Sequence, residues 1–153
     1  MIKNNISKFI AVFVTAGVVL SACKKDNDDT PSQVQRLMFN WKITDITTPK
    51  VNQPATDSTL YKACMADDIA ALTNTGFDFQ DGANKCDSTI FNYSKGTWAY
   101  KPSGDSIQLG ATAPANKYTS WKIVTLNDSV LKVRYTDSTN PAKKFVKTIS
   151  FKH

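Results

Sequence analysis

The chain has 153 residues and a formal net charge of +6, with 19 Lys and Arg residues against 13 acidic residues, all of them Asp. This length predicts one domain, and the single histidine, His153, argues against a histidine-based metal site or catalytic centre. The 17 Thr, three Trp, five Tyr and eight Phe residues suit a pleated, half-buried surface, while the helix former Glu is missing, so the composition argues against an all-helical protein.

The first 22 residues are predicted to be a signal peptide. Lys3 and Lys8 make its start basic, and the apolar run at residues 9–20 is shorter than the ~20 residues that a membrane-spanning helix needs. The run ends in Leu-Ser-Ala-Cys at residues 20–23, which resembles the lipobox of bacterial lipoproteins at all four positions. The resemblance implies that Cys23 becomes the N-terminus and is a membrane anchor carrying a diacylglycerol and a further acyl chain such as palmitate, because two or more chains hold a protein stably.

Residues 23–33 are predicted to be the lipidated Cys and a flexible tether, since residues 24–32 include no apolar side chain to bury. Lys24 stands where an Asp would favour retention in the inner membrane, so the expected location is the cell envelope, anchored at the outer membrane. The acidic cluster Asp-Asn-Asp-Asp at residues 26–29 resembles the surface-export signal of Bacteroidetes lipoproteins, and a plain solvated linker is the alternative. The periplasmic face and the cell surface therefore both stay open.

Residues 34–153 are predicted to be one all-β domain, because short alternating segments are separated by turn residues. Two connections are long, residues 48–66 and 110–117, and residues 57–63 could form one helical turn. We expect an eight-stranded antiparallel meander that closes into a barrel, with a β-sandwich as the alternative. The expected strands are residues 37–47, 67–73, 77–80, 97–101, 106–109, 118–126, 130–136 and 143–152.

Cys64 and Cys86 are predicted to form a structural disulfide, as an exported domain meets an oxidising compartment. The second and third strands turn around residues 74–76, so facing residues have numbers that sum to about 149 or 150, and the two Cys numbers sum to 150. The bridge would stabilise the fold by about 3 kcal/mol. A redox role is less favoured because the sequence has no CxxC motif and no His beside either thiol.

Several segments form a recognisable ordered set: the first strand with Trp41, the two Cys with their Asp neighbours, the hairpin at residues 74–79, the Gly-Thr-Trp at residues 96–98, and the strands at residues 121–126 and 131–135. Together they resemble the small lipocalin-like lipoproteins of Bacteroidetes. Phe39 stands where that family usually has Gly. A Gly there would let the backbone pack closely at the barrel floor, so whether this chain has that packing stays open. The family also implies a late Arg over the first Trp; Arg134 is the candidate, as a cation–π partner of Trp41 or as an ordinary outward-facing Arg.

The sequence contains no phosphate-binding loop, catalytic motif or EF-hand, so we expect no enzymatic activity, no cofactor and no metal site. Asp67 and Asp68 are interpreted as a solvated strand start. The basic excess is spread along the strands, so no nucleic-acid partner is expected.

Two functions stay open: a carrier of a small apolar or amphipathic ligand, with the loop at residues 48–66 over its mouth, and a filled barrel that binds a protein or glycan through its loops. Lys147 shares the phase of the inward residues 145 and 149. It is predicted either to point inward, as a counter-ion for an acidic ligand, or to lie at a bulge or at the rim. The candidate ligand-binding residues are Trp41, Phe77, Phe79, Trp98, Trp121, Leu131, Lys147 and Phe151.

Overall fold

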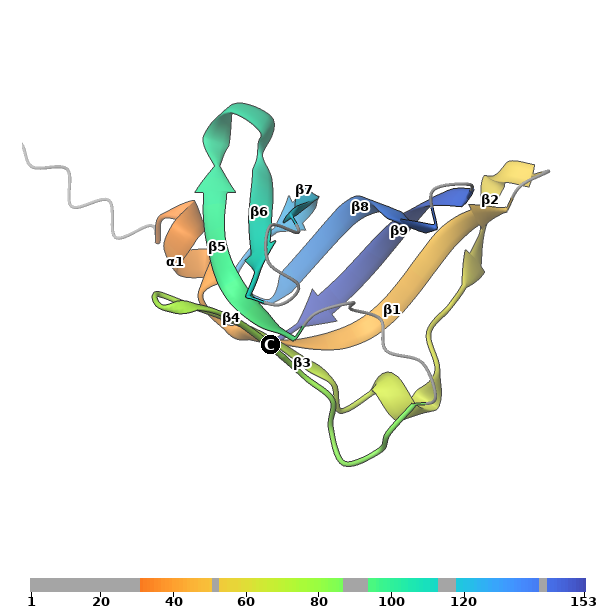
Figure 1. Cartoon of the computed structure of the whole chain (residues 1–153), viewed down its shortest axis with the longest axis horizontal. Helices are drawn as coiled ribbons and strands as arrows, with labels where there is room; N and C mark the ends of the chain where they lie inside the picture. The colour runs from red at the N-terminus through yellow and green to blue at the C-terminus, as the bar shows by residue number, and fades with distance from the viewer. Residues whose placement is uncertain (1–30, 51–52, 87–93, 113–117, 141–142) are drawn as a thin grey trace, which may run out of the picture.

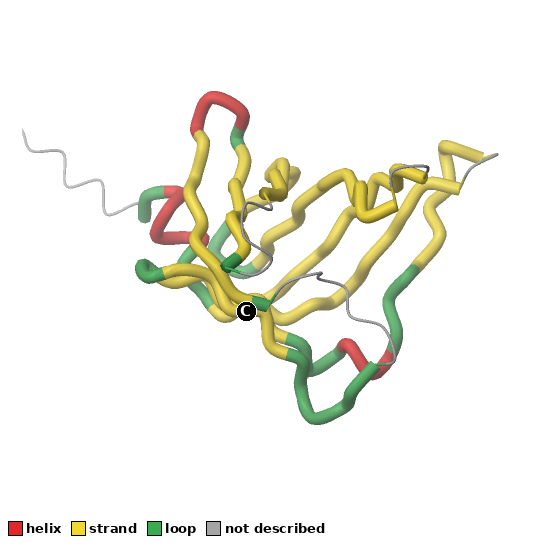
Figure 2. Tube along the Cα trace, in the orientation of Figure 1, coloured by secondary structure: helices red, strands yellow, loops and turns green. Residues whose placement is uncertain are grey.

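The computed structural model describes residues 31–50, 53–86, 94–112, 118–140 and 143–153. Strands dominate these residues (Figure 2). No helix among them is long and apolar enough to cross a membrane. The predicted signal peptide and Cys23 lie outside the described residues.

Nine strands and three short helical segments make up the described part of the chain. The helical segments are α1 (Gln33–Leu37) and the 3-10 turns η1 (Ala63–Met65) and η2 (Pro102–Gly104). The strands are β1 (Asn40–Lys50), β2 (Gln53–Thr59), β3 (Ile69–Thr73), β4 (Gly76–Gln80), β5 (Lys95–Lys101), β6 (Ser106–Ala111), β7 (Tyr118–Leu126), β8 (Val130–Asn140) and β9 (Lys143–Lys152).

Eight of the strands close into an antiparallel β-barrel. The sheet order is β2-β1-β3-β4-β5-β6-β7-β8-β9, and β1 also pairs with β9, which joins the last barrel strand to the first (Figure 1). Every pairing is antiparallel, and β3 faces β4 with numbers that sum to 149, as in the pair of Leu72 with Phe77. The predicted all-β meander and its closure are therefore confirmed, and the alternative sandwich is not formed.

The two ends of the barrel differ. What we call the closed end carries α1 and the turns after β3, β5 and β7; the open end carries the longer connections, including β2. Ser32 caps α1 with a reciprocal bond to Gln35, and the Arg36 Nε lies 3.1 Å from the Asp128 Oδ1 in the β7–β8 turn. The Tyr100 hydroxyl bonds Gln33 and also donates to the Asp105 Oδ1. These contacts hold α1 across the closed end.

The start of the first strand was predicted wrongly. Leu37 and Phe39 alternate with Trp41 in sequence, but Leu37 belongs to α1 and β1 begins at Asn40. Leu37 is buried, whereas Phe39 is 38% exposed and its ring stacks on His153 at a centroid distance of 4.1 Å. The reason is that α1, which lies across the closed end, directs Leu37 into the core. The apolar alternation in the sequence therefore spans a helix and a strand and not one strand.

The connection at residues 48–66 was also predicted wrongly as a loop with a helical turn at residues 57–63. Residues 48–50 extend β1, residues 53–59 form β2, and the helical turn is the 3-10 segment Ala63–Met65. β3 pairs with β1 at Asn40, Trp41 and Lys42, and β2 takes over the same edge from Thr47 onward. β2 therefore pairs with the part of the β1 edge that β3 is too short to cover.

The hydrophobic core fills the barrel around its aromatic side chains. Trp41, Ile43, Trp121 and Phe151 are almost fully buried, on strands β1, β7 and β9. Their neighbours along each strand point outward, as the burial pattern of β7 shows. Alternation along the strands is thus the reason that the interior is apolar and the outer surface polar.

Candidate functional site

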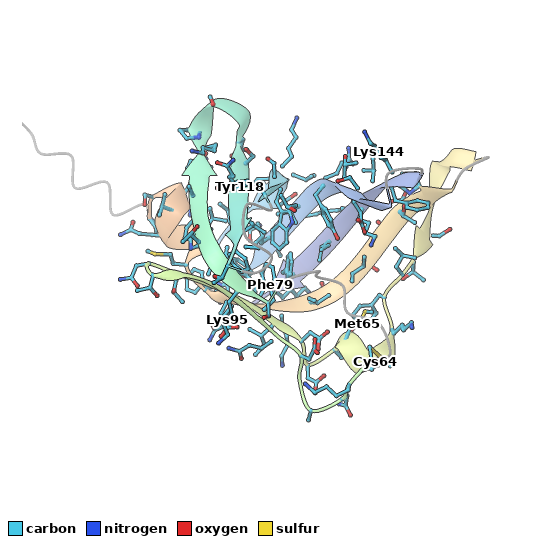
Figure 3. The ribbon with its side chains drawn as sticks, viewed as in Figure 1. Cys64, Met65, Phe79, Lys95, Tyr118 and Lys144 are labelled. Carbon is cyan, nitrogen blue, oxygen red and sulfur yellow. A yellow bond between two sulfur atoms is a disulfide. The ribbon has the colours of Figure 1, made fainter. Side chains whose placement is uncertain are left out.

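An aromatic cluster occupies the interior of the barrel. Phe79 on β4 lies in the middle of the molecule (Figure 3), and its ring stacks on Trp121 at a centroid distance of 5.4 Å and an interplanar angle of 10°. Trp121 also lies 5.9 Å from the ring of Phe151 and 6.2 Å from the ring of Tyr135. Phe77 packs against Phe79 at 4.7 Å. Rings from β4, β7, β8 and β9 thus meet at one place.

A charged pair lies on the inner face of the wall, toward the open end from this cluster. The Lys147 Nζ is 2.7 Å from the Asp137 Oδ2, and the two side chains are 20% and 18% exposed. Tyr135 pairs with Lys147 across β8 and β9 and is buried, and Val133 and Ile149, the next inward pair, are fully buried. Lys147 therefore faces inward, which was one of its two predicted positions.

On the open-end side of this pair, the inner wall ends in an exposed aromatic residue, Phe145, which pairs with Asp137 and is 43% exposed. Tyr118 at the start of β7 is 67% exposed and lies on the outer face, because Trp121 and Ile123 are inward residues of that strand. Phe145 was expected to be inward with Ile149 and Phe151; it keeps their phase, but lies beyond the part of the barrel where neighbouring strands cover it. The inner wall thus passes from apolar rings, through a charged pair, to an exposed rim.

The structure brings most of the predicted ligand-binding residues together. Trp41, Phe77, Phe79, Trp121, Leu131 and Phe151 belong to one buried cluster. Trp98 packs against this cluster but is only partly buried, and its Nε1 donates to the Thr73 carbonyl oxygen at 2.7 Å. β5 extends past the β3–β4 turn, so its Trp98 can reach back to Thr73 and hold that turn against β5.

The floor of the barrel is packed by rings in place of the close backbone contact that a Gly at position 39 would allow. Trp41 donates from Nε1 to the Leu37 carbonyl oxygen at 2.9 Å, and its ring lies edge-on to Phe39 and His153. Arg134 on β8 is exposed, whereas Trp41 is fully buried. Arg134 therefore takes the outward-facing position, which was the second of the two predictions for it.

The predicted disulfide between Cys64 and Cys86 is confirmed, with a Cα–Cα distance of 5.6 Å. It links the connection before β3 to the connection after β4, at the lower right of the view where Cys64 and Met65 are labelled (Figure 3). Both cysteines are partly buried against the core. The bridge therefore closes a covalent ring around the β3–β4 hairpin.

Asp67 and Asp68 were predicted to be a solvated strand start, and for Asp68 this is wrong because the side chain is 9% exposed. The Asp68 Oδ1 accepts from the Gly82 N–H at 3.0 Å, and the Asp67 Oδ2 accepts from the backbone N–H and Nδ2 of Asn84. The bond from the Asn84 N–H lowers the pKa of Asp67, while burial raises the pKa of Asp68. The two carboxylates thus fasten the loop at residues 81–86 beside the disulfide.

Sequence reasoning missed Asp137, because the predicted strand at residues 130–136 ended just before it, at a segment rich in turn residues. β8 runs to Asn140, so the inward phase of Leu131, Val133 and Tyr135 reaches Asp137 after two more residues. The signal was present in the alternation, but the turn composition of residues 137–141 masked it. Within the described residues, no group of three or more His, Cys, Asp or Glu side chains is placed to hold a metal ion.

No family model, curated protein or solved structure matches this chain. The inner wall of the barrel offers a cation, a carboxylate and a phenol on neighbouring strands, next to stacked aromatic rings. This arrangement suits non-covalent binding of a molecule with one apolar part and one polar end.

Proposed function

We propose that this chain is an exported, lipid-anchored, lipocalin-like protein that binds a small amphipathic ligand at the open end of its barrel. The apolar part of the ligand contacts the aromatic cluster around Trp121, and its acidic group faces Lys147. The observation that carries the proposal is the Lys147–Asp137 pair, with its side chains 20% and 18% exposed on the inner wall.

Folding alone does not account for a charged pair at this place. Moving an ion out of water costs several kcal/mol even after the protein relaxes, and apolar residues of similar size are often as stabilising as a buried ion pair. The inward positions next along these strands, Val133 and Ile149, are filled by aliphatic side chains. A cation in the wall beside an aromatic cluster is instead suited to the acidic end of a ligand, and Asp137 is its partner within the chain.

The lipid anchor is the second part of the proposal, and it is supported by the lipobox sequence at residues 20–23. A Cys23→Ala variant should incorporate no labelled palmitate and should leave the membrane fraction. Wild-type-like membrane partition together with palmitate incorporation would contradict the anchor.

An interaction module with a filled interior is the second candidate, and one observation favours it. The rings of Phe79, Trp121 and Phe151 lie within 6 Å of one another in succession, so they occupy the interior that a large ligand would need. Such a barrel would bind a protein or glycan through its loops and rim, where Tyr118 and Phe145 are exposed.

Native mass spectrometry distinguishes the two candidates. The Cys23→Ala chain is incubated with palmitic acid and, separately, with its methyl ester, which keeps the apolar chain but removes the charge. We expect a bound mass and a change in tryptophan fluorescence with the acid, and at least tenfold weaker binding of the ester. Lys147→Gln should weaken binding of the acid to the level of the ester, because the counter-ion is lost.

Lys144→Gln is the matched control, since Lys144 lies on the same strand and is exposed (Figure 3). It removes the same charge but should leave binding of the acid unchanged. An absence of bound mass for both compounds, with unchanged tryptophan fluorescence, would exclude the carrier for this ligand class and favour the interaction module.

A further inference from the structure

The outer face of β7, β8, β9 and β1 gathers basic side chains that the sequence distributes along the chain. These four strands are consecutive neighbours in the barrel and run side by side (Figure 1). Because inward and outward residues alternate, the residues between the buried core positions share the outer surface. We call the closed-end half of this surface the basic face; its cations are Lys42, Lys122, Lys132, Arg134 and Lys152.

Two pairs of these cations lie directly opposite each other. Lys42 pairs with Lys152 between β1 and β9, and Lys122 pairs with Arg134 between β7 and β8. Like charges in facing positions destabilise a sheet. The arrangement therefore costs stability, and the fold alone gives no reason for it.

None of the five cations forms an ion pair within the part of the chain that the structure describes. The ion pairs found there use Arg36, Lys85, Lys95 and Lys147. Asp45 is an acidic neighbour on the same outer face, facing Ser150, and it leaves a clear excess of positive charge.

Four acidic side chains lie together elsewhere in the barrel. Asp78 and Asp81 lie on β4 and just after it, where they pair with Lys95 and Lys85, and Asp67 and Asp68 fasten the adjacent loop. The molecule is therefore electrostatically two-sided, with neutralised charges around β3 and β4 and unpaired cations on the basic face.

We propose that the basic face docks on a membrane surface that carries anionic lipid headgroups. This inference rests on the lipid anchor at Cys23. Residues 24–32 span at most about 30 Å when fully extended, so the anchor would hold the barrel within reach of the headgroups. The tether leads into α1, and Arg36 of α1 pairs with Asp128 in the β7–β8 turn, so the chain arrives beside an edge of the basic face.

The geometry suits a flat, diffuse anionic surface. The five cations stand on adjacent strands at the ends of long, flexible side chains, so they can approach such a surface together. This closeness matters because the attraction of each falls off within about 8 Å at physiological salt. In the docked state the barrel lies with these strands toward the membrane, and the side with β3, β4 and the disulfide faces away from it.

Vesicle sedimentation tests the proposal. The full chain with Cys23→Ala is mixed with vesicles of 30% phosphatidylglycerol in phosphatidylcholine, and with vesicles of phosphatidylcholine alone. The neutral vesicles measure any background from the apolar residues 9–20, which all variants share. We expect preferential binding to the anionic vesicles that is lost when NaCl is raised from 0.05 to 0.5 M.

Two triple variants with equal charge locate the binding surface. Lys42→Gln, Lys132→Gln and Lys152→Gln should weaken binding to the anionic vesicles by about 100-fold, at roughly fivefold for each cation. Lys62→Gln, Lys85→Gln and Lys101→Gln remove three lysines outside the basic face and should have an effect of less than fivefold. The first set removes like-charge repulsion, so its thermal midpoint should not fall, which shows that the loss is not due to unfolding.

Equal binding to neutral and anionic vesicles, or equal effects of the two triple variants, would overturn the proposal. Binding to a sulfated glycan without binding to the anionic vesicles would overturn it as well, in favour of a glycan partner. Because these assays use Cys23→Ala, they do not depend on lipidation. The anchor itself is tested by palmitate incorporation in cells. A failure of the anchor and a failure of the basic face to bind anionic vesicles can therefore be told apart.

Discussion

The closed end and the open end of the barrel are held together by different kinds of contact. At the closed end, the ring of Trp41 is fully buried beneath α1, and Phe39 and His153 stack beside it. At the open end, the Cys64–Cys86 disulfide and the carboxylates of Asp67 and Asp68 join one connection to another. The floor of the closed end is filled by apolar side chains, with α1 held over it by polar contacts. The connections at the open end are instead joined to one another by covalent and polar links.

This difference shows how one barrel can combine a fixed floor with an accessible rim. Packing stabilises the floor by filling it, so the interior there is unavailable to any other molecule. The links at the open end run between connections and leave the inner wall to Tyr135, Asp137 and Lys147. The stability of the two ends should therefore respond to different perturbations, and the following predictions test this from the largest expected effect to the smallest.

Trp41→Ala should be the most damaging single substitution at the closed end. It removes a fully buried ring and the Nε1–H bond to the Leu37 carbonyl oxygen, so we expect a loss of about 3–5 kcal/mol in the free energy of unfolding. Trp98→Ala is the control, because Trp98 is only partly buried, and should cost less than half as much. Chemical denaturation followed by circular dichroism measures both. Equal losses would show that the floor is not a special packing site.

Cys64→Ser with Cys86→Ser should lower the free energy of unfolding by about 3 kcal/mol, as the bridge closes a segment with a sequence separation of 22. Hydrogen exchange should increase at residues 81–86 and stay near the wild-type rate at residues 40–43. Reduced wild-type protein is the matched comparison and should behave like the double variant. Faster exchange at both ends alike would mean that the two ends are not independent.

Acid should loosen the loop at residues 81–86 before it affects the floor. The pKa of Asp67 lies below its ordinary value of 3.8, so its bonds to Asn84 stabilise the folded loop above that pH and are lost as the pH falls through the folded-state pKa. Burial of Asp68 raises its pKa and favours its protonated form, so its contribution has the opposite sign. The NMR signal of the Asn84 amide should shift below pH 4, while that of the Trp41 Nε1–H should not.

Asp67→Asn should abolish that shift of the Asn84 amide, because the charged acceptor is gone at every pH. A shift of the same size in the variant would assign the titration to another group.

Alternation and turn composition were sufficient to predict most of the barrel. The bounds of β7 and β9 agree with the predicted strands, and the register of the β3–β4 hairpin, which gave the disulfide, follows from a turn at residues 74–75. These elements are strongly patterned and their partners are close in sequence. Local information therefore determines them.

The parts that failed depend on distant contacts. β2 has the sequence Gln-Pro-Ala-Thr-Asp-Ser-Thr, which lacks a hydrophobic alternation, and it forms since β1 offers an unpaired edge. Asp68 is buried because Gly82 donates to it from the far side of a hairpin. In the candidate site, the aromatic positions were predictable by phase, whereas the pairing of Lys147 with Asp137 required the extended β8–β9 hairpin. The gathering of cations on one outer face likewise appears only after closure.

Closure of the barrel joins residues that are about as far apart in sequence as the domain allows. Lys42 to Thr47 on β1 pair with Lys152 to Thr148 on β9, whereas the neighbouring hairpins pair residues close in sequence. The β3–β4 hairpin can therefore form early from local contacts, but β1 has no partner along its β9 edge until the last strand has been synthesised. High contact order of this kind slows folding. A nascent chain thus exposes the β1 edge, and this edge is where we expect a chaperone or a misfolded neighbour to bind first.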